Sequence, residues 1–91
     1  MKDIKQGMMA WSRAGHDMDR LYVIMGQDSD YVYLTDGRLR PLSNPKKKRW
    51  KHVQVKKQIP AELQNVDWNN IKDEQVKRAI KMMKRKIKQE V

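Results

Sequence analysis

The chain has 91 residues and a mass of 10.9 kDa, which suits one small domain with an appendage but not two ordinary domains. Its 21 Lys and Arg residues against 11 Asp and Glu give a net charge of +10, which favours a polyanionic partner. The absence of cysteine excludes disulfides and thiolate chemistry, and the longest apolar run, Leu21 to Met25, is far shorter than the roughly 20 residues of a membrane span. Residues 1–6 lack the apolar stretch of a signal peptide, so we expect an N-terminal extension on a cytoplasmic protein.

Short β-branched and aromatic stretches between turn signals predict five strands within residues 7–58. The predicted strands are residues 8–12, 20–25, 31–35, 38–42 and 52–55. Asp36-Gly37 is typical of a tight hairpin turn and predicts that residues 38–42 return beside residues 31–35. Five short antiparallel strands indicate a mainly β fold, a small barrel, because closure removes exposed strand edges. The expected core residues are Trp11, Leu21, Val23, Val32, Leu34 and Val53.

Positive charge is concentrated in the middle of the chain. Residues 38–57 carry nine bases and no acid, whereas residues 1–37 carry four bases and six acids. The densest part follows the chain break at Ser43-Asn44-Pro45, and we predict a basic loop over residues 45–51. Such a segment is typical of a surface that binds phosphates and releases their counterions.

After residue 58 the spacing of the hydrophobic residues changes from the short runs of the strands to the three- and four-residue spacing of a helix. Residues 59–70 read as a linker in which Trp68 pins the next element to the barrel, and residues 71–90 read as a basic amphipathic helix with Asn70 as its N-cap. The helical stripe consists of Val76, Ala79, Ile80, Met83 and Ile87. This stripe is expected to dock on the barrel, with docking on a partner as the alternative.

One segment of the sequence resembles a known motif. Residues 8–24 look like a KOW motif, a strand, a turn with Gly15 and a second strand, except that the motif's characteristic glycine falls on Asp19. Asp tolerates the left-handed conformation better than most residues, so the turn is expected to survive. The continuation through residues 31–37 and 46–53 is similar to the small KOW-containing large-subunit ribosomal proteins of archaea and eukaryotes, and the chain most resembles short bacterial KOW-domain RNA-binding proteins.

The resemblance, which covers residues 7–56, implies an SH3-like barrel and an RNA-binding, ribosome-associated role. The predicted partner is RNA, ribosomal RNA or a ribosomal particle, bound mainly through phosphates, and the free protein is expected to be a monomer. The candidate RNA-binding residues are Arg38, Arg40, Lys46, Lys47, Lys48, Arg49, Trp50, Lys51, His52, Lys56 and Lys57. Trp50 either stacks on a base or packs on the barrel, and His52 either makes a structural hydrogen bond or meets a phosphate.

Catalysis, cofactors, small-molecule substrates and membranes are not expected. No serine has a histidine in a recognisable motif, and no glycine-rich phosphate cradle exists. The pairs Asp17/Asp19 and Asp28/Asp30 lack the further ligands of a calcium loop and are predicted to form turns. Two other function classes stay open: a transcription-associated KOW factor that contacts polymerase, and an adaptor that acts through the C-terminal helix.

Overall fold

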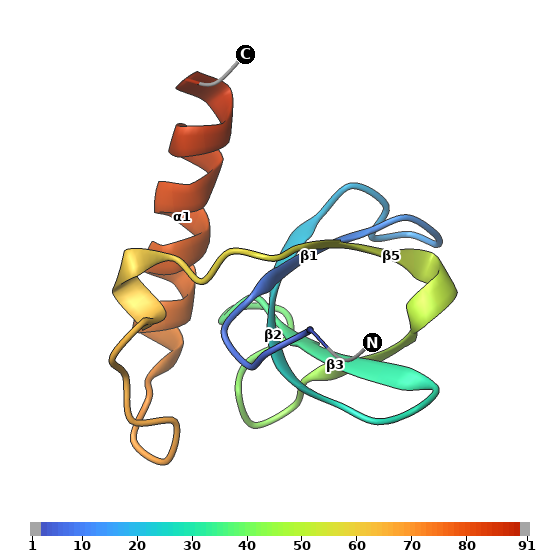
Figure 1. Cartoon of the computed structure of the whole chain (residues 1–91), viewed down its shortest axis with the longest axis horizontal. Coiled ribbons are helices and arrows are strands. Elements are labelled where there is room, and N and C mark those ends of the chain that lie inside the picture. Colours follow the sequence, from blue (N-terminus) through green and yellow to red (C-terminus); the bar gives the residue numbers. More distant parts are fainter. Residues whose placement is uncertain (1–2, 90–91) are drawn as a thin grey trace.

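The computed structural model describes residues 3–89, in which five antiparallel strands form one twisted sheet with a C-terminal helix at its side (Figure 1). The strands are β1 (Met9–Ser12), β2 (Leu21–Gln27), β3 (Tyr31–Thr35), β4 (Lys46–Arg49) and β5 (Val53–Lys56). Their order in the sheet is β4-β3-β2-β1-β5, and a short 3₁₀ turn, η1 (Trp50–His52), links the two edge strands. The mainly β class and the number of strands, five, are therefore confirmed, in a form consistent with a small SH3-like barrel.

The first four residues of β2, Leu21–Ile24, are buried on both faces of the sheet, which explains why all four are apolar or aromatic. Tyr22 and Ile24 point into the barrel, where they join Val32 and Leu34 of β3 in one core cluster. Partly buried side chains pack against this cluster, among them Trp50 and the predicted core residue Val53. The interior of the barrel is thus built from alternate residues of each strand.

The other face of β1 and β2 forms a second core under the helix. Leu21 and Val23 belong to this second cluster with Met9, and the partly buried Trp11 packs against it. The cluster is completed by residues of η2 (Ala61–Leu63) and of α1 (Asp73–Gln89). Leu21 and Val23 are therefore core residues as predicted, but they lie between sheet and helix rather than inside the barrel.

The apolar stripe of α1 docks on the barrel, as expected. Val76, Ala79, Ile80 and Met83 are buried in the second cluster, and Ile87 packs against it. Trp68 packs on the same cluster and lies close to Gly7, where an added Cβ would come within 3.3 Å of its ring. This stripe is already occupied by the barrel, so it is not free to fill a partner's groove.

The start of α1 differs from the prediction. The helix begins at Asp73, and the Gln75 side chain accepts a hydrogen bond of 2.8 Å from the backbone N–H of Lys72, as in half of a capping box. Asn70 instead donates its side-chain N–H to Asp67, 2.7 Å away. No helix among residues 3–89 is long and apolar enough to cross a membrane.

The fourth strand is where the sequence prediction was wrong. Residues 38–42 are not a strand, and the predicted basic loop instead contains β4, whose residues pair with β3 from Tyr31 opposite Arg49 to Leu34 opposite Lys46. Gly37 adopts φ +75°, and an added Cβ would come within 2.5 Å of the Asp73 carbonyl oxygen. The turn at Gly37 therefore directs the chain against the start of α1, and pairing with β3 resumes only at Lys46.

Candidate nucleic-acid interface

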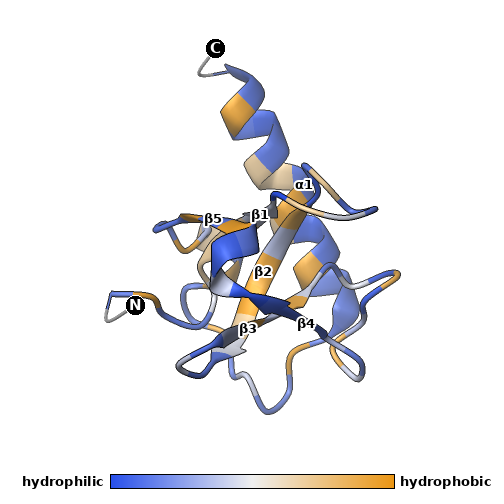
Figure 2. Cartoon of the chain, turned by 90° about the vertical axis from the view of Figure 1, so that its right-hand side faces the viewer, coloured by the Kyte–Doolittle hydropathy of each residue, from blue (hydrophilic) through white to orange (hydrophobic). Residues whose placement is uncertain are grey.

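The basic residues of β4 divide into two sets because side chains alternate along a strand. Lys46 and Lys48 stand opposite Leu34 and Val32, whose side chains fill the barrel. Lys47 and Arg49 stand opposite Tyr33 and Tyr31 on the outer face. In Figure 2, β4 and the η1 turn form a hydrophilic strip in front of the apolar β2.

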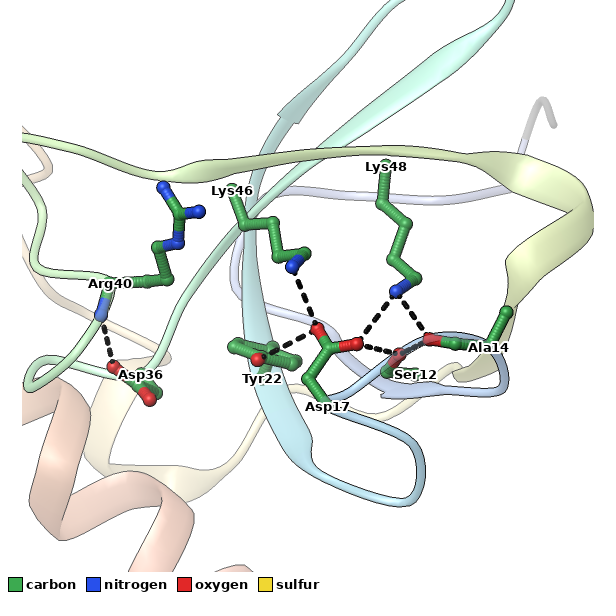
Figure 3. A network of polar contacts seen from close by, with 8 residues as sticks. All are labelled: Ser12, Ala14, Asp17, Tyr22, Asp36, Arg40, Lys46 and Lys48. Atoms are coloured by element: carbon green, nitrogen blue, oxygen red, sulfur yellow. Dashed lines mark hydrogen bonds and ion pairs between the residues drawn. The ribbon is translucent and has the colours of Figure 1, made fainter.

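The inward set is held by a buried carboxylate, Asp17 (Figure 3). Lys48 is only 8% exposed, and its Nζ lies 2.8 Å from Asp17 Oδ1 and 2.8 Å from the carbonyl oxygen of Ala14. Lys46 Nζ lies 3.3 Å from Asp17 Oδ2. Ser12 Oγ and the Tyr22 hydroxyl also donate to this carboxylate, at 2.9 and 3.0 Å. Asp17 is therefore the centre of an ion-pair network and not a turn-forming carboxylate, which corrects the sequence prediction.

Burial and hydrogen bonding act in opposite directions on Asp17. Burial by itself raises the pKa of the carboxyl group, but the hydrogen bonds from Lys48, Ser12, Tyr22 and Lys46 outweigh it and hold this pKa well below its usual range. Burial, together with the hydrogen bond to the Asp17 carboxylate, raises the pKa of the Tyr22 hydroxyl to about 12. Asp17 is thus charged at neutral pH, and it ties the turn between β1 and β2 to β4.

The outward set forms what we call the β3–β4 surface: Tyr31, Tyr33, Lys47 and Arg49. Lys47 Nζ lies 4.2 Å and Arg49 Cζ 5.0 Å from the centroid of the Tyr31 ring, which are cation–π distances. Both basic side chains are exposed, and neither forms an ion pair within residues 3–89. The sequence reasoning did not count the tyrosines as site residues, although the alternation Tyr31/Val32/Tyr33/Leu34 already sets them apart from the core.

The turn between β2 and β3 is built by a carboxylate, as the sequence predicted for Asp28. Asp28 Oδ1 accepts the backbone N–H groups of Asp30 and Tyr31, and its Oδ2 accepts the Tyr33 hydroxyl at 2.9 Å. These hydrogen bonds, those from the backbone first, hold the pKa of Asp28 below its ordinary value. In the turn between β1 and β2, Asp19 adopts φ +69° and pairs with Arg13 at 2.6 Å, so the left-handed conformation expected at this position is confirmed.

The remaining predicted site residues lie in three places. Lys51 is exposed and His52 half-buried in η1, which continues from β4. Lys56 and Lys57 lie at the end of β5, on the other edge of the sheet, and Lys57 pairs with Asp3 at 3.4 Å. Arg38 is exposed and Arg40 half-buried in the segment before β4. The eleven predicted residues therefore do not form a single patch.

Trp50 belongs to the barrel. Its ring packs against the barrel cluster, and its Nε1–H donates to the Asp28 carbonyl oxygen at 3.0 Å. Because the barrel cluster already covers one side of the ring, packing on the barrel fits the structure better than stacking on a base.

Replacing Trp50 with alanine is expected to lower the free energy of unfolding by about 1–3 kcal/mol, since half-buried apolar surface and one hydrogen bond are removed. Urea denaturation measures this loss, and Trp50→Phe is the control that keeps most of the packing. Weaker RNA binding at unchanged stability would contradict the packing role.

The chain matches no family model and no curated protein, so the case for a function rests on the geometry of its surfaces.

Proposed function

We propose that this protein is an RNA-binding protein of the KOW type, associated with the ribosome, that holds structured RNA through its phosphates. The observation that supports this most strongly is the β3–β4 surface, where two cations stand over an outward-facing tyrosine with no acid of residues 3–89 paired to them. Cations free of acidic partners are the groups that exchange with the counterions of a nucleic-acid backbone. The net charge of +10 likewise favours a nucleic acid as the partner.

The proposed contact set is narrower than the sequence-based set. Lys47, Arg49 and Lys51 are exposed and follow each other along β4 and η1, so they are assigned to phosphates. Lys48 is left out, because its ammonium group is buried against Asp17, and moving it to RNA would leave that carboxylate with fewer partners. Lys46, half-buried and 3.3 Å from the same carboxylate, is left out for the same reason.

The double variant Lys47→Gln/Arg49→Gln tests this surface. If both residues contact phosphates, the log–log salt slope of RNA binding should become shallower by about 1.4–1.8, at roughly 0.7–0.9 per contact. The probe is a synthetic RNA hairpin with a single-stranded tail, titrated by fluorescence anisotropy over a series of salt concentrations. Lys5→Gln/Lys72→Gln removes the same charge from exposed positions elsewhere and is the matched control.

Two outcomes would count against the proposal. If the wild-type protein does not bind the hairpin at low salt, the proposed RNA-binding function is wrong. If the two double variants have equal salt slopes, the β3–β4 surface is not where RNA binds. Sucrose-gradient fractionation of native lysate tests the ribosomal part separately: the protein is expected with a ribosomal particle, and recovery with polymerase after nuclease treatment would favour the transcription factor instead.

A further inference from the structure

A second cationic surface lies away from β4, between the segment before that strand and the C-terminal helix. It is a groove of about 600 Å³, and we call it the helix groove. Its cationic residues are Arg20, Arg38, Lys77, Lys81 and Lys84. Its apolar lining consists of the buried Leu21 and Ile80 and of Leu39, which is 70% exposed.

The three lysines occupy one side of α1. They follow each other at spacings of four and three residues, which places them along a single stripe of a helix with about 100° per residue. The stripe lies beside the buried one and is exposed. Because the docking of Val76 and Ile80 fixes how α1 is rotated on the barrel, it also fixes which lysines face the groove.

The opposite wall is held rigidly against the helix. Leu42 donates its backbone N–H to Asp73 Oδ1 at 2.8 Å, and Gly37 packs so closely on the start of α1 that no side chain fits there. Asp36 accepts the backbone N–H groups of Arg38 and Arg40, at 2.8 and 2.9 Å. The groove is therefore formed by contacts within the protein before any ligand arrives.

The charges of the groove point to a polyanion. Asp36 is the single acid among its lining residues, and both of its hydrogen bonds go to the adjoining backbone. The five cations exceed it by four charges, in a chain that is already strongly basic. A surplus of like charges held close together costs free energy, and a bound anion lowers that cost by neutralising them.

We propose that the helix groove is a second RNA-binding site, which holds a sugar-phosphate backbone on its lysines and arginines. This inference rests on the proposed function, and it deepens it, because the RNA would then contact the protein on both the β3–β4 surface and the helix. Continuity favours the same RNA as occupant, because Arg38 lines the groove and the segment that carries it continues through Arg40 into β4. The exposed Leu39 offers an apolar surface to a ribose or base.

The variant Lys77→Gln/Lys81→Gln/Lys84→Gln tests the site. Because three side chains can then no longer neutralise a phosphate, the salt slope for the RNA hairpin should become shallower by about 2–3. The matched control is Arg78→Gln/Arg85→Gln/Lys86→Gln, which removes the same charge from exposed positions of α1 that do not line the groove. The control should change the slope by less than about 1, and circular dichroism should show both variants folded.

Crosslinking gives an independent readout, because the natural chain has no cysteine. Leu39→Cys, labelled with a thiol-directed photo-crosslinker, is expected to capture the hairpin. Asn65→Cys, exposed outside the groove, is the control and should capture little.

The outcomes separate this inference from the proposed function. If the wild type binds RNA but the groove and control variants have equal slopes, or Leu39→Cys captures no more RNA than Asn65→Cys, the helix groove is not an RNA site and the β3–β4 proposal stands. If poly-glutamate competes as well as RNA and loses its binding only in the groove variant, the occupant is an acidic protein segment. If the wild type does not bind RNA, the proposed function fails first.

Discussion

Replacing Asp17 with asparagine is expected to lower the free energy of unfolding by about 2–4 kcal/mol, because Lys48 keeps a buried positive charge without its partner. The loss is large for a protein of this size, whose total stability is of the order of 5–15 kcal/mol. Urea denaturation at neutral pH measures it. Lys47→Met is the control on the same strand: its side chain is exposed and loses only the contact with the Tyr31 ring, so stability should change by no more than about 1 kcal/mol.

A double-mutant cycle with Lys48→Met isolates the ion pair. In Asp17→Asn/Lys48→Met both charges are gone, so the double variant should be more stable than the sum of the two single losses predicts, by about 1–3 kcal/mol. Additive losses would show that Asp17 acts through Ser12 and Tyr22 rather than through the lysine.

The same residue sets the acid limit of the fold. The pKa of Asp17 is lower in the folded protein than in the unfolded chain, so its contribution is present above the ordinary carboxylate value and is lost as pH falls below about 4. Stability measured across that window should fall more steeply in the wild type than in Asp17→Asn. Parallel pH profiles would contradict this.

Val76→Asp is expected to have the other large effect, a loss of about 4 kcal/mol or more. Val76 is fully buried between sheet and helix, so the new carboxylate has no water and no cationic partner in the apolar cluster around it. Thermal unfolding followed by circular dichroism measures the loss. Met82→Asp, on the exposed side of the same helix, introduces the same charge and should cost no more than about 1 kcal/mol.

One outcome of this pair would overturn the role assigned to the helix. If Val76→Asp keeps the wild-type melting temperature, the helix is not needed for the stability of the barrel. The lysines of the helix groove would then not be held in position by docking, and the second RNA site would lose its structural basis.

Local patterns in the sequence determined much of this protein. Alternation over residues 31–35 separates Val32 and Leu34, which fill the barrel, from Tyr31 and Tyr33 on the outer face. The apolar spacing after residue 72 predicts the helix and its buried stripe. Both follow from side-chain periods that depend only on neighbouring residues.

The tertiary structure alone decided where the fourth strand lies. The charge of Lys46–Arg49 is typical of a solvated loop, yet these residues form β4. The strand pairs with β3 through backbone hydrogen bonds, which do not depend on side-chain charge, and its inward lysines are neutralised by the carboxylate of Asp17. That carboxylate, Asp17, is separated from Lys48 by 31 residues, so no local pattern marks the pair. The division of the basic run into two faces follows from its pairing with β3 as a strand. Which of its basic side chains are structural, and which are free for a ligand, depends on the distant contact with Asp17.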